Sequence, residues 1–145
     1  MSKGFGSGSS KKKINVKQFY LVKKFAEGEK YYHAKNYSKA ELIFSNLKDS
    51  GYEDPNLFLY LANIYILNGF NEKAINILKR ALETNPENPN LYYNLGTIYF
   101  KRSEYKNSIN YYLKGLSLDP NNAFAYSNLA GCYEEILDYE NAVDY

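Results

Sequence analysis

The chain of 145 residues combines 45% hydrophobic with 23% charged residues, which is the balance of a single soluble globular domain. Its net charge of +2 hides an asymmetry, because four of its 18 basic residues precede residue 14 and residues 14 to 145 hold 14 basic and 16 acidic residues. That balance argues against a nucleic-acid surface. The sequence has neither an apolar run that could span a membrane nor a secretory signal, so we expect a cytoplasmic protein without a membrane partner.

The first 13 residues, MSKGFGSGSSKKK, form a segment of glycine, serine and lysine with almost nothing to bury. We therefore expect a disordered basic tail over 1–13, ahead of a folded domain over 14–145. The lysines of this tail fit a solvated, solubilising role, and contact with phosphate or an acidic partner is the alternative.

An internal repeat with a period of 34 residues organises the rest of the chain. Small residues recur in one column and tyrosines recur in a second. The first column holds Gly28, Ala62, Gly96 and Ala130, the second holds Tyr31, Tyr65, Tyr99 and Tyr133, and a third holds Ala40, Ala74, Ser108 and Ala142. Because these columns agree in phase, we predict units over 21–54, 55–88 and 89–122, and a partial unit over 123–145.

Each unit contains two helical patterns, which are clearest in the unit 89–122. The stripe of the first helix occupies one helix face and comprises Tyr92, Leu95, Gly96 and Tyr99. After a polar turn over 102–104, the stripe of the second helix comprises Ser108, Ile109, Tyr112, Gly115 and Leu116. Pro120 ends the unit because proline cannot continue a helix. The small residues allow close backbone approach, so the sequence predicts an all-α fold of antiparallel helix hairpins stacked into an α-solenoid.

The run YYNLGTIYFKRSEYKNSINYYLKGLSLDPNN, residues 92–122, resembles a tetratricopeptide repeat, and the resemblance extends over residues 21–145. It implies a right-handed α-solenoid that binds other proteins on its concave face. The first unit departs most from the pattern, because Lys24 and Glu27 replace an aromatic residue and a leucine, and Tyr52 replaces the proline. We interpret it as a capping repeat whose outer face meets water.

Candidate catalytic and metal-binding groups are sparse. With a single cysteine, Cys132, and a single histidine, His33, neither a disulfide nor a His/Cys metal cluster is predicted. We expect Cys132 to be a small buried thiol and His33 to be a solvated residue at a helix end. Glu134 and Glu135 occupy consecutive helical positions, so they do not converge on one substrate. We therefore expect no cofactor and no enzyme.

Most of the 17 tyrosines fall in packing columns, which disfavours a role in stacking on bases.

The candidate binding surface is the side of each first helix that lies opposite the packing stripe. The predicted peptide-binding residues are Leu59, Tyr60, Asn63, Asn90, Tyr93, Asn94, Thr97, Lys101, Phe124, Ser127 and Asn128. Asn94 and Asn128 lie in register, and an asparagine side chain can pair with both the N–H and the C=O of a peptide group. This column, and the run AFAYSNLAGCYEE over 123–135, resemble the asparagine ladder on the inner surface of O-linked N-acetylglucosamine transferases.

Two alternatives bear on this surface. Tetratricopeptide repeats often carry asparagine in this column for solubility or for a local hydrogen bond, so that interpretation stays open beside peptide contact. Tetratricopeptide domains that bind acidic chaperone C-termini need lysine and arginine on this face. This chain has Leu59, Phe124 and Asn128 in those columns, which disfavours such a partner.

The last unit stops at Tyr145 inside its predicted second helix, just after Ala142 and Val143 begin an apolar stripe. We expect either a fragment of a longer array, or docking or self-association at this uncapped edge. Two functions follow. The first is a non-enzymatic scaffold that binds a peptide or partner protein, and the alternative is the N-terminal, substrate-recruiting arm of a larger transferase. The downstream reading frame would separate them.

Overall fold

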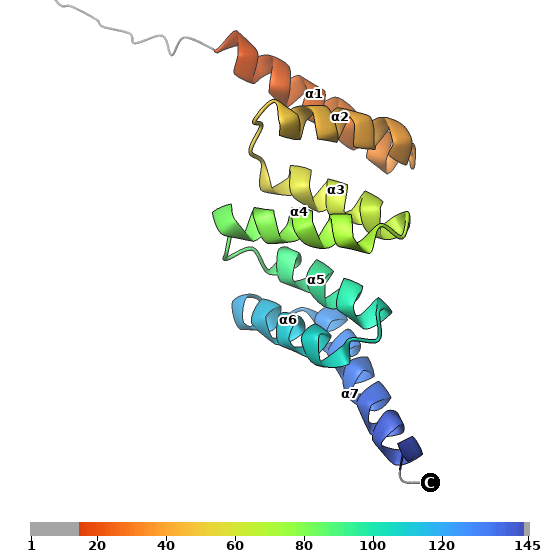
Figure 1. Ribbon diagram of the computed structural model, residues 1–145. Helices are drawn as coiled ribbons and strands as arrows, with labels where there is room; N and C mark the ends of the chain where they lie inside the picture. Colours follow the sequence, from red (N-terminus) through yellow and green to blue (C-terminus); the bar gives the residue numbers. More distant parts are fainter. Residues whose placement is uncertain (1–14, 144–145) are drawn as a thin grey trace, which may run out of the picture.

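The computed structural model describes residues 15–143, with side chains described as far as Leu137. The predicted tail over 1–13 lies outside the described residues. Seven helices and no strand occur within residues 15–143 (Figure 1). They are α1 (Val16–His33), α2 (Tyr37–Asp49), α3 (Pro55–Leu67), α4 (Asn71–Thr84), α5 (Pro89–Lys101), α6 (Tyr105–Leu118) and α7 (Ala123–Val143).

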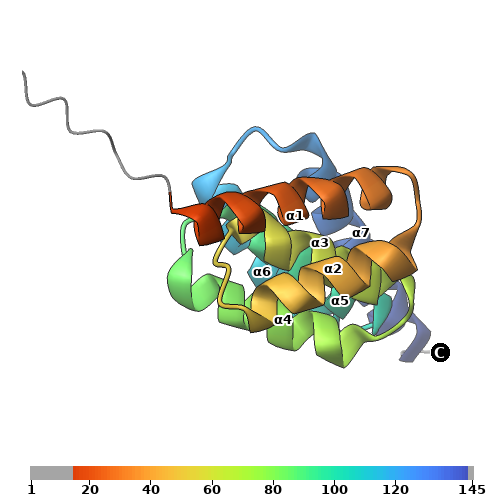
Figure 2. The same ribbon diagram turned by 90° about the horizontal axis from the view of Figure 1, so that it is seen from above.

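The helices pair into hairpins that stack in chain order. Helix α1 packs on α2, α3 on α4 and α5 on α6, and consecutive hairpins meet where α2 contacts α3, α4 contacts α5 and α6 contacts α7. Seen from above, α2 and α4 lie toward one side of the stack and α1 toward the other (Figure 2). Contacts of α5 with both α3 and α7 join the first helices into a continuous surface. The predicted all-α solenoid of helix hairpins is confirmed.

The turn inside each complete hairpin depends on one residue with a left-handed backbone. That residue is Lys35 (φ 59°), Gly69 (φ 76°) or Ser103 (φ 59°), one in each unit at the same repeat position. After each of them the chain closes a Schellman motif, as in the third unit, where the Glu104 N–H donates to the Tyr99 carbonyl at 2.9 Å. The paired α-helices therefore reverse direction within three residues.

The first helices of the later units begin with local capping signals. The side chains of Asp54 and Asn88 accept hydrogen bonds from the backbone N–H groups of the second residues of α3 and α5, and a proline follows each of them. Helices α3, α5 and α7 thus begin at the first residue of their predicted units. Helix α1 begins earlier, at Val16, where Asn15 is the N-cap.

Glycines let large rings lie directly on a neighbouring helix backbone. A Cβ atom on Gly96 would lie 3.0 Å from the Tyr112 ring, and one on Gly115 would lie 2.4 Å from Tyr93 Cε1. Ser108 is fully buried between the same helices and donates a hydrogen bond to the Gly96 carbonyl at 2.8 Å. The close approach predicted from these small residues is confirmed.

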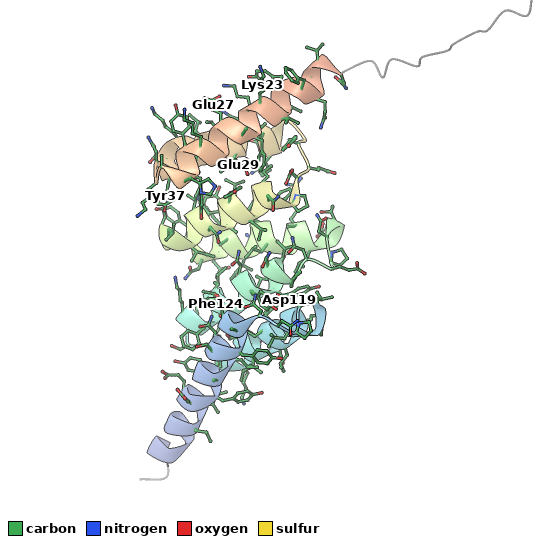
Figure 3. All side chains as sticks on the ribbon, turned by 180° about the vertical axis from the view of Figure 1, so that it is seen from behind. Lys23, Glu27, Glu29, Tyr37, Asp119 and Phe124 are labelled. Atoms are coloured by element: carbon green, nitrogen blue, oxygen red, sulfur yellow. The ribbon has the colours of Figure 1, made fainter. Side chains whose placement is uncertain are left out.

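The outer side of the first hairpin mixes charge with apolar surface. Lys24 and Glu27 form an ion pair with an Nζ–Oε2 distance of 2.7 Å. Figure 3 shows Glu27 and Lys23 on the side of α1 away from α3. Phe19 and Tyr20, in the preceding turns of α1, are nevertheless 53% and 57% exposed. The interpretation as a capping repeat with a polar outer face therefore fits Lys24 and Glu27. It does not fit the N-terminal turns of α1, where Phe19 and Tyr20 are exposed.

The prediction that a second helix has begun in the last unit is wrong. Helix α7 runs without a turn from Ala123 to Val143, past the position where the other first helices end. That position is held by Leu137, in the repeat register of Lys35, Gly69 and Ser103. The left-handed region is costly for any residue with a Cβ, and at Lys35 and Ser103 the contacts of the returning helix offset that cost, whereas at Leu137 the helix continues.

Candidate functional site on the first helices

The structure places the predicted binding residues on three adjacent first helices. Asn90, Lys101, Phe124 and Ser127 are exposed, and the half-buried group comprises Leu59, Tyr60, Asn63, Asn94, Thr97 and Asn128. Tyr93 is buried. Lys101 is the only formally charged residue among the eleven predicted, so the surface that they form is close to neutral.

Asn63 and Asn94 meet across the interface between α3 and α5. The Asn94 Nδ2 donates a hydrogen bond to the Asn63 Oδ1 at 3.2 Å. This pairing crosses from one repeat to the next. Contact of the in-register residues Asn94 and Asn128 with a bound peptide stays a prediction. Within the described residues neither amide makes another hydrogen bond and neither leaves a buried polar atom without a partner. Each amide therefore keeps donors or acceptors that face solvent.

The repeat position of Asn63 also identifies a residue of the candidate surface, Glu29, that was not predicted from the sequence. Glu29 occupies that column in the first unit, and its Oε1 accepts a hydrogen bond from the Tyr60 hydroxyl at 3.1 Å. In Figure 3 Glu29 lies on the side of α1 that faces α3. Burial, and then the Glu29 carboxylate, raise the pKa of Tyr60. The 34-residue register was the available signal, because it aligns Glu29 with Asn63.

Tyr60 belongs to an aromatic cluster that stiffens the first two hairpins. Its ring stacks on Phe44 at a centroid distance of 5.2 Å and an interplanar angle of 7°, and lies 4.7 Å from the Tyr32 ring. Because its hydroxyl is bonded to Glu29 and its ring is packed on other rings, the Tyr60 side chain is held in place and is only partly accessible. His33, exposed as predicted at the end of α1, places its ring edge-on to Tyr60 at 6.1 Å.

The placement of Tyr93 on the exposed face is wrong. Its side chain is only 4% exposed, its ring covers Gly115, and its hydroxyl donates to the Asp119 carbonyl at 2.9 Å. The absence of a side chain on Gly115 opens the space that draws this tyrosine between α5 and α6. Thr97 is also committed internally, because its hydroxyl donates to the Tyr93 carbonyl at 3.0 Å and lies 2.9 Å from the Tyr112 hydroxyl.

Cys132 is fully buried, which confirms the predicted small buried thiol. Its Sγ donates toward the Ser108 hydroxyl at 3.2 Å, so one hydrogen-bonded chain joins α7, α6 and α5. Burial raises the pKa of this thiol and keeps it protonated at neutral pH.

Among residues 15–137 there is no group of three or more histidine, cysteine, aspartate or glutamate side chains that could hold a metal ion.

None of the helices within residues 15–143 is long and apolar enough to cross a membrane. The aromatic residue of the predicted site with the greatest exposure lies on α7, where Phe124 is 61% exposed. Figure 3 shows Phe124 near the start of that helix, beside α5. The predicted residues thus combine a hydrogen-bonded amide pair with an accessible aromatic ring.

Comparison with protein-family models gave three matches. A model described as TPR repeat matches residues 62–102, and two described as Tetratricopeptide repeat match residues 89–122 and 111–144. A comparison with curated protein sequences gave no significant match.

Solved tetratricopeptide domains share the fold. The Sgt2 TPR domain from Aspergillus fumigatus is 22% identical, with a TM-score of 0.75 over 84% of this chain and 82% of that one. The first TPR of Spaghetti (RPAP3), bound to the HSP90 peptide SRMEEVD, is 20% identical, with a TM-score of 0.76 over 81% and 93%. The yeast Sti1 TPR2AB domain in its complex with pHSP90 is 22% identical, with a TM-score of 0.76 over 87% and 51%. The chain belongs to the tetratricopeptide repeat family.

Proposed function

We propose that the chain is a non-enzymatic interaction scaffold that binds an extended, uncharged segment of a partner protein along α3, α5 and α7. The observation that carries this proposal is the pair formed by Asn63 and Asn94 at the centre of the surface. The pair holds both amides in place before a ligand arrives, so less side-chain entropy is lost on binding. Their remaining donors and acceptors match the N–H and C=O groups of an extended backbone.

The charge of the surface distinguishes this ligand from an acidic one. SRMEEVD, the peptide in the Spaghetti complex, carries three acidic side chains. Around the amide pair this chain presents Leu59, Phe124 and Asn128, none of which is cationic. Glu29 adds a carboxylate on the α1 side. An acidic peptide would therefore lose hydration with Lys101 as the one cation among the predicted residues, whereas a neutral segment with an apolar residue can cover Phe124.

An array of peptides of the length of SRMEEVD, synthesised in acidic, neutral and basic series, tests this proposal with labelled protein. We expect binding to neutral peptides and no binding to SRMEEVD. Asn63→Ala with Asn94→Ala should weaken the neutral hits by roughly tenfold, because two backbone hydrogen bonds are lost. The matched control is Asn76→Ala with Asn110→Ala, which removes two exposed asparagines at equivalent positions on α4 and α6.

Equal weakening by both pairs of substitutions would contradict the proposal, and so would a preference for SRMEEVD in the wild-type protein. A gain-of-function variant sharpens the charge argument. Leu59→Lys, Phe124→Lys and Asn128→Arg together place cations around the amide pair, and we expect this triple variant to bind SRMEEVD while losing the neutral peptides. Circular dichroism of each variant checks that helicity is unchanged.

A further inference from the structure

One polar contact between neighbouring first helices occurs twice, with the same spacing along the chain. The Asn94 amide donates to Asn63, and the Tyr60 hydroxyl donates to Glu29. In both contacts the acceptor precedes the donor by 31 residues, so the two contacts occupy equivalent repeat positions. One joins α3 to α5 and the other joins α1 to α3. The line of polar side chains that includes the amide pair therefore continues onto α1, where the acceptor is a carboxylate.

The Glu29 carboxylate is partly accessible. Glu29 is half-buried, and its Oε1 is the atom that accepts from Tyr60. Its Oε2 makes no hydrogen bond within the described residues, where no buried side-chain oxygen or nitrogen lacks a partner, so Oε2 is in contact with solvent. None of the ion pairs among these residues includes Glu29. A cation brought by a ligand would find one carboxylate oxygen unused.

A second carboxylate lies close to Glu29. Asp54, the N-cap residue of α3, also belongs to none of the ion pairs among the described residues. Burial, and then the Asp54 and Glu29 carboxylates, raise the pKa of Tyr52, so both carboxylates act on the same hydroxyl group. Two carboxylates with no paired cation make this end of the surface electrically negative.

The lysines nearest to Glu29 on α1 do not neutralise it. Lys24 is paired with Glu27, and Figure 3 shows Glu27 and Lys23 on the side of α1 away from α3. Glu29 lies on the side that faces α3. Lys30 is exposed and forms no ion pair within the described residues. The surface of the first helices is thus close to neutral around the amide pair and negative at α1.

We infer that the α1 end of this surface binds a lysine or arginine side chain of the partner segment, and that Glu29 selects it. The inference rests on the proposed function and extends the ligand by one feature. The segment is uncharged along α3, α5 and α7 and carries a single cation where it reaches α1. The cation pairs with the unused oxygen of Glu29 while the Tyr60 hydroxyl holds the carboxylate in place. Because the cation is at one end, the segment binds in one preferred direction.

Pools of capped peptides of the length of SRMEEVD test this inference by their binding to the labelled full chain. The randomised positions hold only serine, threonine, asparagine, leucine and tyrosine. One pool is uncharged, and the others carry one lysine at the first, the central or the last position. We expect lysine at one of the two ends to tighten binding by about fivefold, as an ion pair on a partly exposed carboxylate can do. Lysine at the centre or at the other end should give no such gain.

Substitutions on α1 show whether Glu29 is the source of the gain. Glu29→Gln should abolish it and leave the binding of the uncharged pool unchanged, because a glutamine can still accept the Tyr60 hydrogen bond. Glu27→Gln is the matched control, since it removes the same charge from the side of α1 away from α3, and it should keep the gain. Glu29→Lys should transfer the preference to a pool with glutamate at the same end.

Carbodiimide coupling locates the bound lysine independently of affinity. The reagent joins a lysine amine to a carboxylate in contact with it, and tandem mass spectrometry identifies the protein residue. We expect the pool with lysine at the preferred end to couple to Glu29.

Equal binding of the uncharged and lysine pools, or a gain that survives Glu29→Gln, would overturn the inference and leave the proposed function intact. A gain lost equally in Glu27→Gln would assign it to the net charge of the chain and would overturn the inference as well. So would coupling to another carboxylate in place of Glu29. If no pool binds at all, the proposed function fails and the inference fails with it.

Discussion

Helices α5 and α7 begin at the same repeat position and carry the same kind of stripe, yet within residues 15–143 a second helix follows and covers only that of α5. Ser103 adopts a left-handed backbone after α5 and allows α6 to fold back, whereas Leu137 continues α7. As a result Tyr92 is 6% exposed and its counterpart Tyr126 is 51% exposed. The comparison teaches that the stripe indicates which face of a helix is suited to burial, and that the left-handed turn decides whether the next helix packs against that face.

The closed hairpin of α5 and α6 also differs from α7 in how much space surrounds its glycines. On α6 a Cβ at Gly115 would lie 2.4 Å from the buried Tyr93 ring. On α7 a Cβ at Gly131 would meet its nearest neighbour, Phe100, at 3.7 Å, which is an ordinary contact. The closed hairpin is therefore close-packed where α7 still has room.

The largest expected effect comes from Gly115→Ala, which should lower the free energy of unfolding by about 1–3 kcal/mol through overpacking against Tyr93. Urea denaturation followed by circular dichroism measures it. The preceding unit carries Leu59 and Ala81 at these two positions. Adding Tyr93→Leu to Gly115→Ala should therefore recover part of the loss. If the double variant loses more free energy of unfolding than the two single variants lose together, the packing argument is contradicted.

A smaller effect is expected from Ser103→Leu, which gives the closed hairpin the turn residue of α7. Leucine in the left-handed region should cost about 1–2 kcal/mol relative to the Ser103→Gly variant, because glycine lacks the Cβ that makes this region unfavourable. The same denaturation experiment measures it, and Ser103→Gly is the control because glycine adopts that conformation freely. If Ser103→Leu leaves stability unchanged, the identity of this residue does not explain why α7 continues.

The smallest effect is expected from Gly131→Ala on α7. Alanine loses less backbone entropy than glycine in a helix, and no neighbour lies closer than an ordinary contact, so stability should rise by roughly 0.5–1 kcal/mol. Thermal unfolding monitored at a helical wavelength detects the change. A loss of stability as large as that of Gly115→Ala would show that α7 is packed as tightly as α6.

Much of the fold could be predicted from spacing alone. The columns headed by Gly28 and Ala40 placed small residues on facing helices, and Pro120 marked the end of a unit. Such features are local or periodic, so they leave a trace in the sequence. The extension of α1 to Val16 was not predicted, because it precedes the first repeated column.

The candidate site was predictable only in outline. The register of Asn94 with Asn128 could be read from the sequence, but the hydrogen bond between Asn94 and Asn63 could not, because it depends on how α3 and α5 are offset. Tyr93 was misplaced because helix periodicity gives the direction of a side chain and not the space around it. That space depends on Gly115, 22 positions later.

The amino-acid sequence by itself determined that this chain forms repeated amphipathic helices with small residues at their contacts, because 34-residue periodicity and glycine or alanine columns report directly on backbone approach. Only the tertiary structure decided which of those helices are covered, which amides meet, and which tyrosines remain accessible. Those outcomes depend on contacts between residues distant in the chain, and on whether a left-handed turn follows a first helix, as it does at Ser103.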